Sequence, residues 1–108
     1  MSADELRVNW RAEIKMGKAV LGGRTSRLFK DKVTLNVDRN LRPGGHCELA
    51  LLSPKETPDG EQRKVCGRAE ILTSVLSIGQ FQITVRWLDL DNESRQLLDE
   101  KIQAASRM

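Results

Sequence analysis

Apolar and polar residues alternate along most of this chain. Five runs place apolar side chains at every second position, at residues 12–16, 33–37, 47–51, 65–71 and 81–87. A period of two puts successive side chains on opposite faces of an extended strand, so each run predicts a strand with one buried and one wet face. Strands of this kind are typical of antiparallel sheets.

A two-stranded ribbon is barely stable alone. About six short strands that close into a barrel leave no exposed edge strand. We therefore expect an all-β barrel between about residues 11 and 88. Seven apolar positions of the alternating runs should form its core: Ile14, Leu35, Leu49, Ile71, Phe81, Ile83 and Val85.

Glycine and proline mark the connections between the strands. The sequence LRPGG at 41–45 predicts a turn, because proline fixes φ and glycine takes positive φ. Residues 53–63 contain two prolines and a DG pair and predict an exposed loop, and residues 77–80 predict a tight hairpin. Gly22 and Gly23 are interpreted as another turn, since no GK[ST] follows that would make them a phosphate loop.

The period changes near the C-terminus. Asp91 or Asn92 can cap a helix, after which Leu97, Leu98, Ile102 and Ala105 fall on one face. We expect this helix over about residues 92–106, packed on the barrel or against a partner. The whole chain, residues 1–108, is then one domain of ordinary size.

Composition narrows the classes of function. Lysine and arginine outnumber acidic residues by 18 to 15, which permits an anionic partner without demanding one. Aromatic residues make up only 4%, so few rings are available for base stacking, and no DNA or RNA partner is expected. The N-terminal residues lack a signal-peptide pattern and no apolar stretch approaches membrane-spanning length, so we expect a cytoplasmic protein without membrane insertion.

Catalytic and metal-binding groups are scarce. His46 is the one histidine, at a strand start, and Asp89 and Asp91 lie where helix capping explains them. Cys47 and Cys66 each lie in an apolar run and are interpreted as reduced core residues. We therefore expect no enzyme activity, no metal site and no cofactor.

Two arginines near the N-terminus are the first candidate for a binding site. Arg7 and Arg11 flank VNW just ahead of the first expected strand. Two guanidinium groups there would clamp phosphate oxygens or stack on a purine. The spacing alone is equally typical of solvated arginines near a chain end, and on its own favours that interpretation.

The context of this RxxxR sequence resembles the lead segment of PilZ domains, the bacterial receptors for cyclic di-GMP. The sequence NLRPG at 40–44 is similar to the family's L-x-P-G turn, and GRAEI at 67–71 to its g-x-a-x-V strand. Residues 79–87 are similar to its closing strand, which precedes a terminal helix. The resemblance runs from about Leu6 to Ile102. It implies a six-stranded antiparallel PilZ-type β-barrel with one C-terminal α-helix, acting in cyclic di-GMP signalling.

One motif of the family is degenerate here. Where the family has [DN]xSxxG, residues 27–32 read RLFKDK, with Arg27 for the acid, Phe29 for the serine and Lys32 for the glycine. A frame shifted by three keeps Ser26 but places Arg24 at the acidic position. Guanine groups left unpaired in a buried site cost about 1–3 kcal/mol each. Cyclic di-GMP binding is therefore expected to be weakened roughly a hundredfold or more.

The same segment carries positive charge toward the two N-terminal arginines. The candidate ligand-binding residues are Arg7, Arg11, Arg24, Arg27 and Lys32. Either they attract an anionic dinucleotide, or they form a solvated basic strand edge that deters edge pairing. Two functions remain open: a cyclic di-GMP regulatory domain with weakened binding, and a nucleotide-independent adaptor that binds a protein partner through the barrel face or the helix.

Overall fold

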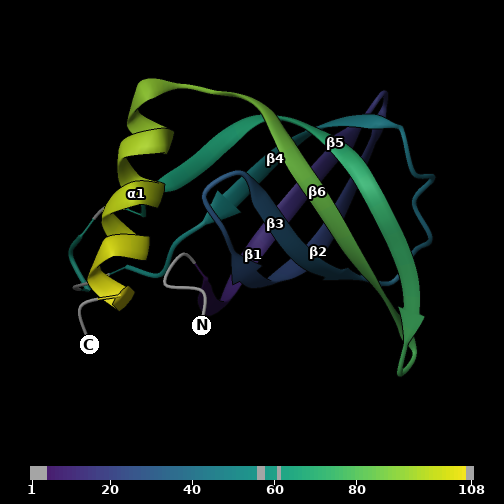
Figure 1. The fold of residues 1–108 in the computed structure, drawn as a ribbon, viewed down its shortest axis with the longest axis horizontal. Helices are drawn as coiled ribbons and strands as arrows, with labels where there is room; N and C mark the ends of the chain where they lie inside the picture. The colour runs from purple at the N-terminus through teal and green to yellow at the C-terminus, as the bar shows by residue number, and fades with distance from the viewer. Residues whose placement is uncertain (1–4, 56–57, 61, 107–108) are drawn as a thin grey trace.

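Six strands and one helix make up the computed structural model, which describes residues 5–55, 58–60 and 62–106 (Figure 1). The elements follow in the order β1 (Leu6–Met16), β2 (Ala19–Leu28), β3 (Lys32–Val37), β4 (His46–Leu52), β5 (Lys64–Ser77), β6 (Gln80–Leu90) and α1 (Asn92–Ser106). The strands close into a barrel in the order β1-β2-β3-β6-β5-β4, and each neighbouring pair is antiparallel. The predicted fold class is confirmed.

The barrel interior is filled by the inward side of each alternating run. Six of the seven predicted core residues are buried, and Ile83 and Leu35 are fully so. Phe81 is half-buried and packs against the edge of the core, so it is only partly inside the barrel. It pairs with Leu76 near the tip of the β5–β6 hairpin, which extends beyond the barrel on the side away from α1 (Figure 1).

The β5–β6 connection is a two-residue turn, as predicted for residues 77–80. Ile78 has φ of 46° and Gly79 has φ of 77°. Positive φ at both central residues matches the right-handed twist of the two strands and is typical of hairpin turns. Glycine takes this conformation freely, whereas a β-branched residue such as isoleucine is strained in it.

The first two strands differ from the prediction. β1 begins at Leu6, so Arg7 and Arg11 lie inside the first strand and not ahead of it. Gly22 and Gly23 lie within β2 and do not form a turn. A Cβ atom on Gly23 would lie 2.7 Å from Cγ1 of Val37, so the close approach of β2 to β3 explains a glycine there.

The helix is anchored to the barrel at its first turn. The backbone N–H of Ser94 donates to Oδ1 of Asp91 at 2.7 Å, and Oγ of Ser94 accepts from the backbone N–H of Cys66 at 2.8 Å. Asp91 is therefore the helix cap, and these bonds to Ser94 hold the pKa of its carboxyl below the ordinary value. Leu97, Leu98 and Ile102 are buried as predicted. The side chain of Ala105 lies outside the described residues.

The described helix is not one that could cross a membrane, since it is too short and too polar. Cys47 is buried and Cys66 half-buried, and both are free thiols. Burial raises the pKa of each thiol.

Candidate functional site

Two arginine pairs face each other across β1 and β2. The register sets Arg7 opposite Arg27, and Arg11 opposite Arg24. All four side chains are exposed. We call these four residues the arginine patch. Directly opposed residues on antiparallel strands have Cβ atoms about 4.5–5.5 Å apart, and like charges in such pairs are destabilising. The fold therefore gains nothing from these two pairs.

A bulge in β2 brings both of its arginines to the outer face. Arg24 and Arg27 are three residues apart, which would place them on opposite faces of a regular strand. The register with β3 shifts between Thr25 and Arg27, so two residues of β2 oppose one of β3. Thr25 and Leu28 both point inward as a result, and the two arginines both point outward. A second shift, in β1 between Arg7 and Trp10, keeps the pairs aligned.

Lys32, the fifth predicted residue, lies at the margin of the patch. It is the first residue of β3, where its carbonyl accepts a hydrogen bond from the N–H of Phe29 at 2.9 Å. Its partner in the register is Arg86 on β6, and not an arginine of β1 or β2. Arg86 is a neighbouring cation that the sequence analysis missed, although the alternation at 81–87 places it on the outer face. Its guanidinium is held by Glu70 at 2.6 Å.

Most of the patch has no counter-charge. Among the ion pairs of the described residues, one reaches it: Nε of Arg27 lies 3.3 Å from Oε1 of Glu5. Arg7, Arg11 and Arg24 make no ion pair with any residue that the structure describes. Three exposed guanidinium groups are thus available to an anion.

Residues 26–32 lie beside the patch and offer few neutral hydrogen-bonding side chains to a ligand. Leu28 is in the core and Phe29 is half-buried in the β2–β3 hairpin. The hydroxyl of Ser26 donates to the backbone carbonyl of Thr34 at 3.2 Å, so its hydrogen is already used inside the sheet. The charged side chains that this segment presents to solvent are those of Arg27, Lys30, Asp31 and Lys32, three cations and one carboxylate.

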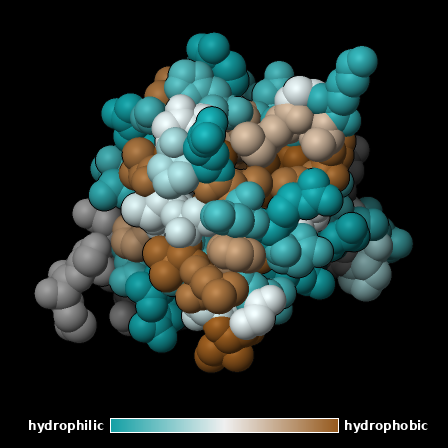
Figure 2. All heavy atoms as spheres, turned by 90° about the vertical axis from the view of Figure 1, so that its right-hand side faces the viewer, coloured by the Kyte–Doolittle hydropathy of each residue, from teal (hydrophilic) through white to brown (hydrophobic). Residues whose placement is uncertain are grey.

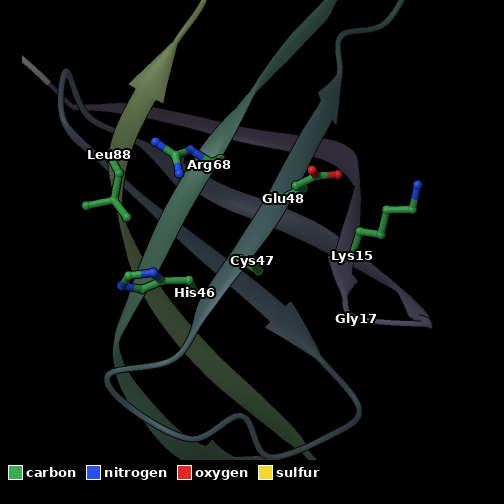
Figure 3. A pocket seen from close by; sticks show the side chains of 7 residues that line it. All are labelled: Lys15, Gly17, His46, Cys47, Glu48, Arg68 and Leu88. Carbon is green, nitrogen blue, oxygen red and sulfur yellow. The ribbon is translucent and has the colours of Figure 1, made fainter.

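Two clefts of the described residues lie away from the arginine patch. One of about 430 Å³ is on the outer wall of β1, β4, β5 and β6, where Lys15, Glu48 and Arg68 project from neighbouring strands (Figure 3). His46 lies at its rim, while Cys47 points behind the sheet into the core. Since adjacent residues of a strand face opposite ways, these two side chains do not form a nucleophile–base pair.

Another cleft, of about 600 Å³, lies between the start of α1 and β5 and includes Lys64 and Glu93. The patch residues line neither of these two clefts. A ligand on the patch would rest on the outer wall of β1 and β2, held by the charges of the arginines and by contact with their exposed side chains.

No family model matches this chain, and no curated protein matches it in sequence. Solved structures do match it. The Bacillus subtilis inhibitor of motility MotI/DgrA is similar with a TM-score of 0.78 and 11% identity, over 96% of this chain and 48% of that one. The PilZ domain of YcgR from Escherichia coli, solved with cyclic di-GMP, has a TM-score of 0.69 and 12% identity, over 95% of this chain and 88% of that one.

A third structure, the Borreliella burgdorferi PlzA protein in complex with cyclic di-GMP, has a TM-score of 0.51 and 13% identity, over 93% of this chain and 52% of that one. This chain thus spans about half the length of the MotI/DgrA and PlzA chains. At these identities the likeness is one of fold.

Proposed function

We propose that this chain, which has the PilZ-type fold, is a non-enzymatic regulatory domain of bacterial cyclic di-GMP signalling that binds the dinucleotide weakly through its arginine patch. The observation that carries the proposal is the pair of opposed arginines on the outer wall of β1 and β2, Arg7 with Arg27 and Arg11 with Arg24. Two structures of the same fold were solved with cyclic di-GMP, which supports this choice of anion.

The charges of the patch suit a ligand with two phosphates. Each cross-strand pair places two guanidinium groups within reach of one phosphate, and each guanidinium presents a fork of donors. Hydrogen bonds to charged groups contribute about 1.5–3 kcal/mol each. An anion also relieves the repulsion between Arg7 and Arg27 and between Arg11 and Arg24, so binding recovers free energy that folding lost.

Recognition of the guanine base is expected to be the weak part. Ser26 is engaged by Thr34, and Phe29 has no donor or acceptor in its side chain. Each guanine group left without a partner costs about 1–3 kcal/mol. Phosphate contacts then supply most of the affinity, and phosphate-dominated binding weakens steeply with salt.

Calorimetric titration with cyclic di-GMP tests this proposal. We expect measurable heat at about 50 mM salt and a large loss of affinity at about 200 mM. Replacing Arg7 and Arg11 together with alanine should abolish binding. Arg39→Ala/Arg42→Ala, which removes two exposed arginines from the β3–β4 connection, is the matched control and should bind as the wild type does. Tight binding that ignores salt, or no heat at the lowest salt, contradicts the proposal.

A second candidate function is a nucleotide-independent adaptor, and the β5–β6 hairpin favours it. Val75, Leu76 and Ile78 are 56%, 66% and 100% exposed. Figure 2 shows apolar atoms gathered at its lower edge, where Figure 1 has the hairpin tip. Ile78 also takes a strained positive φ where asparagine or glycine would serve the turn better. Exposed apolar side chains of this kind mark contact surfaces.

The substitution Ile78→Asn tests the adaptor function without lowering the stability of the fold. Asparagine accepts positive φ at lower cost than isoleucine, so the variant should be at least as stable as the wild type. If the domain acts as an adaptor, a partner captured by the wild type and by the Arg7→Ala/Arg11→Ala variant should be lost with Ile78→Asn. Retention of that partner by Ile78→Asn would rule the hairpin out as its contact.

A cytoplasmic location belongs to the same proposal. Cys47 and Cys66 are both free thiols, as is usual for proteins of a reducing compartment.

A further inference from the structure

The ion pair between Glu5 and Arg27 occupies part of the arginine patch before any ligand arrives. Glu5 directly precedes β1. Arg7, two residues further along β1, is paired with Arg27 of β2. Oε1 of Glu5 lies 3.3 Å from Nε of Arg27. The two side chains are 26% and 45% exposed, so the pair is partly shielded from water.

The carboxylate is held incompletely. Oε1 of Glu5 is buried, yet it accepts no hydrogen bond from the described residues. The contact with Arg27 is therefore a close charge pair without good donor geometry. Buried carboxylate oxygens are normally satisfied by donors, because each lost hydrogen bond is costly. An incompletely satisfied carboxylate at the start of a strand is easily displaced into water.

We propose that Glu5 is an internal competitor for the ligand: its carboxylate holds Arg27 in the free protein and is displaced when a phosphate group binds there. This inference rests on the proposed function of the arginine patch. A phosphate group offers Arg27 two oxygens for a bidentate contact, which the single Nε contact with Glu5 does not provide. The ligand must therefore break the ion pair, and the affinity of the free protein is lower than the patch alone would give.

The size of the effect follows from the exposure of the pair. Ion pairs that water reaches contribute little, and partial shielding raises the contribution only modestly. Removing the competing carboxylate should therefore lower the Kd for cyclic di-GMP by a factor of about three to ten. An ion pair this exposed is too weak for Glu5 to prevent cyclic di-GMP binding in the wild type altogether.

The test compares calorimetric Kd values for cyclic di-GMP in four variants at low salt. Glu5→Gln removes the charge and keeps the shape of the side chain. Glu48→Gln is the matched control, because it removes an exposed carboxylate that lies opposite Lys15 on the outer wall of β4, away from the patch, and changes the net charge equally. Arg27→Ala, alone and combined with Glu5→Gln, shows whether the gain depends on the ion pair.

We expect Glu5→Gln to bind about three to ten times more tightly than both the wild type and Glu48→Gln, and to give no gain when Arg27 is alanine. Equal affinities of Glu5→Gln and Glu48→Gln overturn the inference and leave the proposed function intact. A gain from Glu5→Gln that persists without Arg27 overturns it as well. If neither the wild type nor Glu5→Gln gives heat, the proposed function fails and the inference falls with it.

Discussion

Gly67 lies where the backbone of β6 approaches β5 closely, and replacing it with alanine is the sharpest test of this barrel. In the register Gly67 is paired with Leu90, next to a shift between Arg68 and Ala69. A Cβ atom on Gly67 would overlap the backbone carbonyl oxygen of Asp89 and lie 3.0 Å from Cδ2 of Leu90. A carbonyl oxygen of the neighbouring strand cannot rotate away as the end of a side chain can, so the two strands must separate.

The expected cost is large for a single methyl group. Extra methyl groups in a well-packed core cost about 1–3 kcal/mol when side chains absorb the strain. Here the backbone must absorb it, just before β6 leads into the cap of α1, so we expect Gly67→Ala to lower the free energy of unfolding by about 3 kcal/mol or more. With about 4 °C per kcal/mol for a domain of this size, the melting temperature should fall by about 12 °C or more.

Gly22→Ala is the matched control. Gly22 is also a strand residue, and a Cβ atom there meets nothing within 4 Å. Its replacement should leave stability unchanged or raise it by about 0.4–1 kcal/mol through the unfolded state. Trp10 and Trp87 are both buried, so their fluorescence reports unfolding in urea. If Gly67→Ala is as stable as Gly22→Ala, β5 and β6 are not paired in this register.

Three further predictions concern the core, the helix cap and a thiol. Ile83→Ala should lower the free energy of unfolding by about 2–5 kcal/mol in urea titrations, whereas Val75→Ala, at an exposed position, should change it little. Because the native pKa of Asp91 is lowered, its cap stabilises the fold above the ordinary value of 3.8 and is lost as the pH falls through the lowered native pKa. The stability difference between the wild type and Asp91→Ala should therefore shrink in acid, and a difference that stays constant in thermal melts down to about pH 2 would contradict the assignment. Burial raises the pKa of Cys47, so iodoacetamide should modify it more slowly in the native protein than in urea, as followed by mass spectrometry.

Much of the barrel could be predicted from alternation alone, because a period of two survives wherever one face of a strand is buried. The clearest case is 81–87, where Ile83, Val85 and Trp87 are all buried. Phe81 has the same parity and is only half-buried, since parity does not reveal where a hairpin leaves the barrel. The point at which the hairpin leaves the barrel is set by tertiary contacts, which the alternation along one strand does not contain.

β1 begins at Leu6, five residues before the predicted start of the barrel, and the sequence pattern already contains this extension. Leu6, Val8 and Trp10 continue the inward side of β1, with Arg7 between them on the outward side. The alternation therefore extends to residue 6, so residues 6–10 are a strand and not a lead segment ahead of one. Gly23 is a different case, because the need for glycine there comes from the distance to Val37 on β3, which no local pattern encodes.

The arginine patch depends on a feature that the sequence pattern does not contain. Arg7 and Arg11 share a face by their spacing of four, but Arg24 and Arg27, three apart, would share one only if the strand is irregular. A regular β2 would turn one of these guanidinium groups into the core, where an unpaired charge is prohibitively costly. The bulge after Thr25 resolves this conflict by turning both arginines outward, and it creates the like-charge pairs that an anion would relieve. The bulge that keeps charge out of the core therefore also assembles the candidate site. A change that removes the bulge should both destabilise the fold, by turning a guanidinium inward, and take that arginine out of the patch.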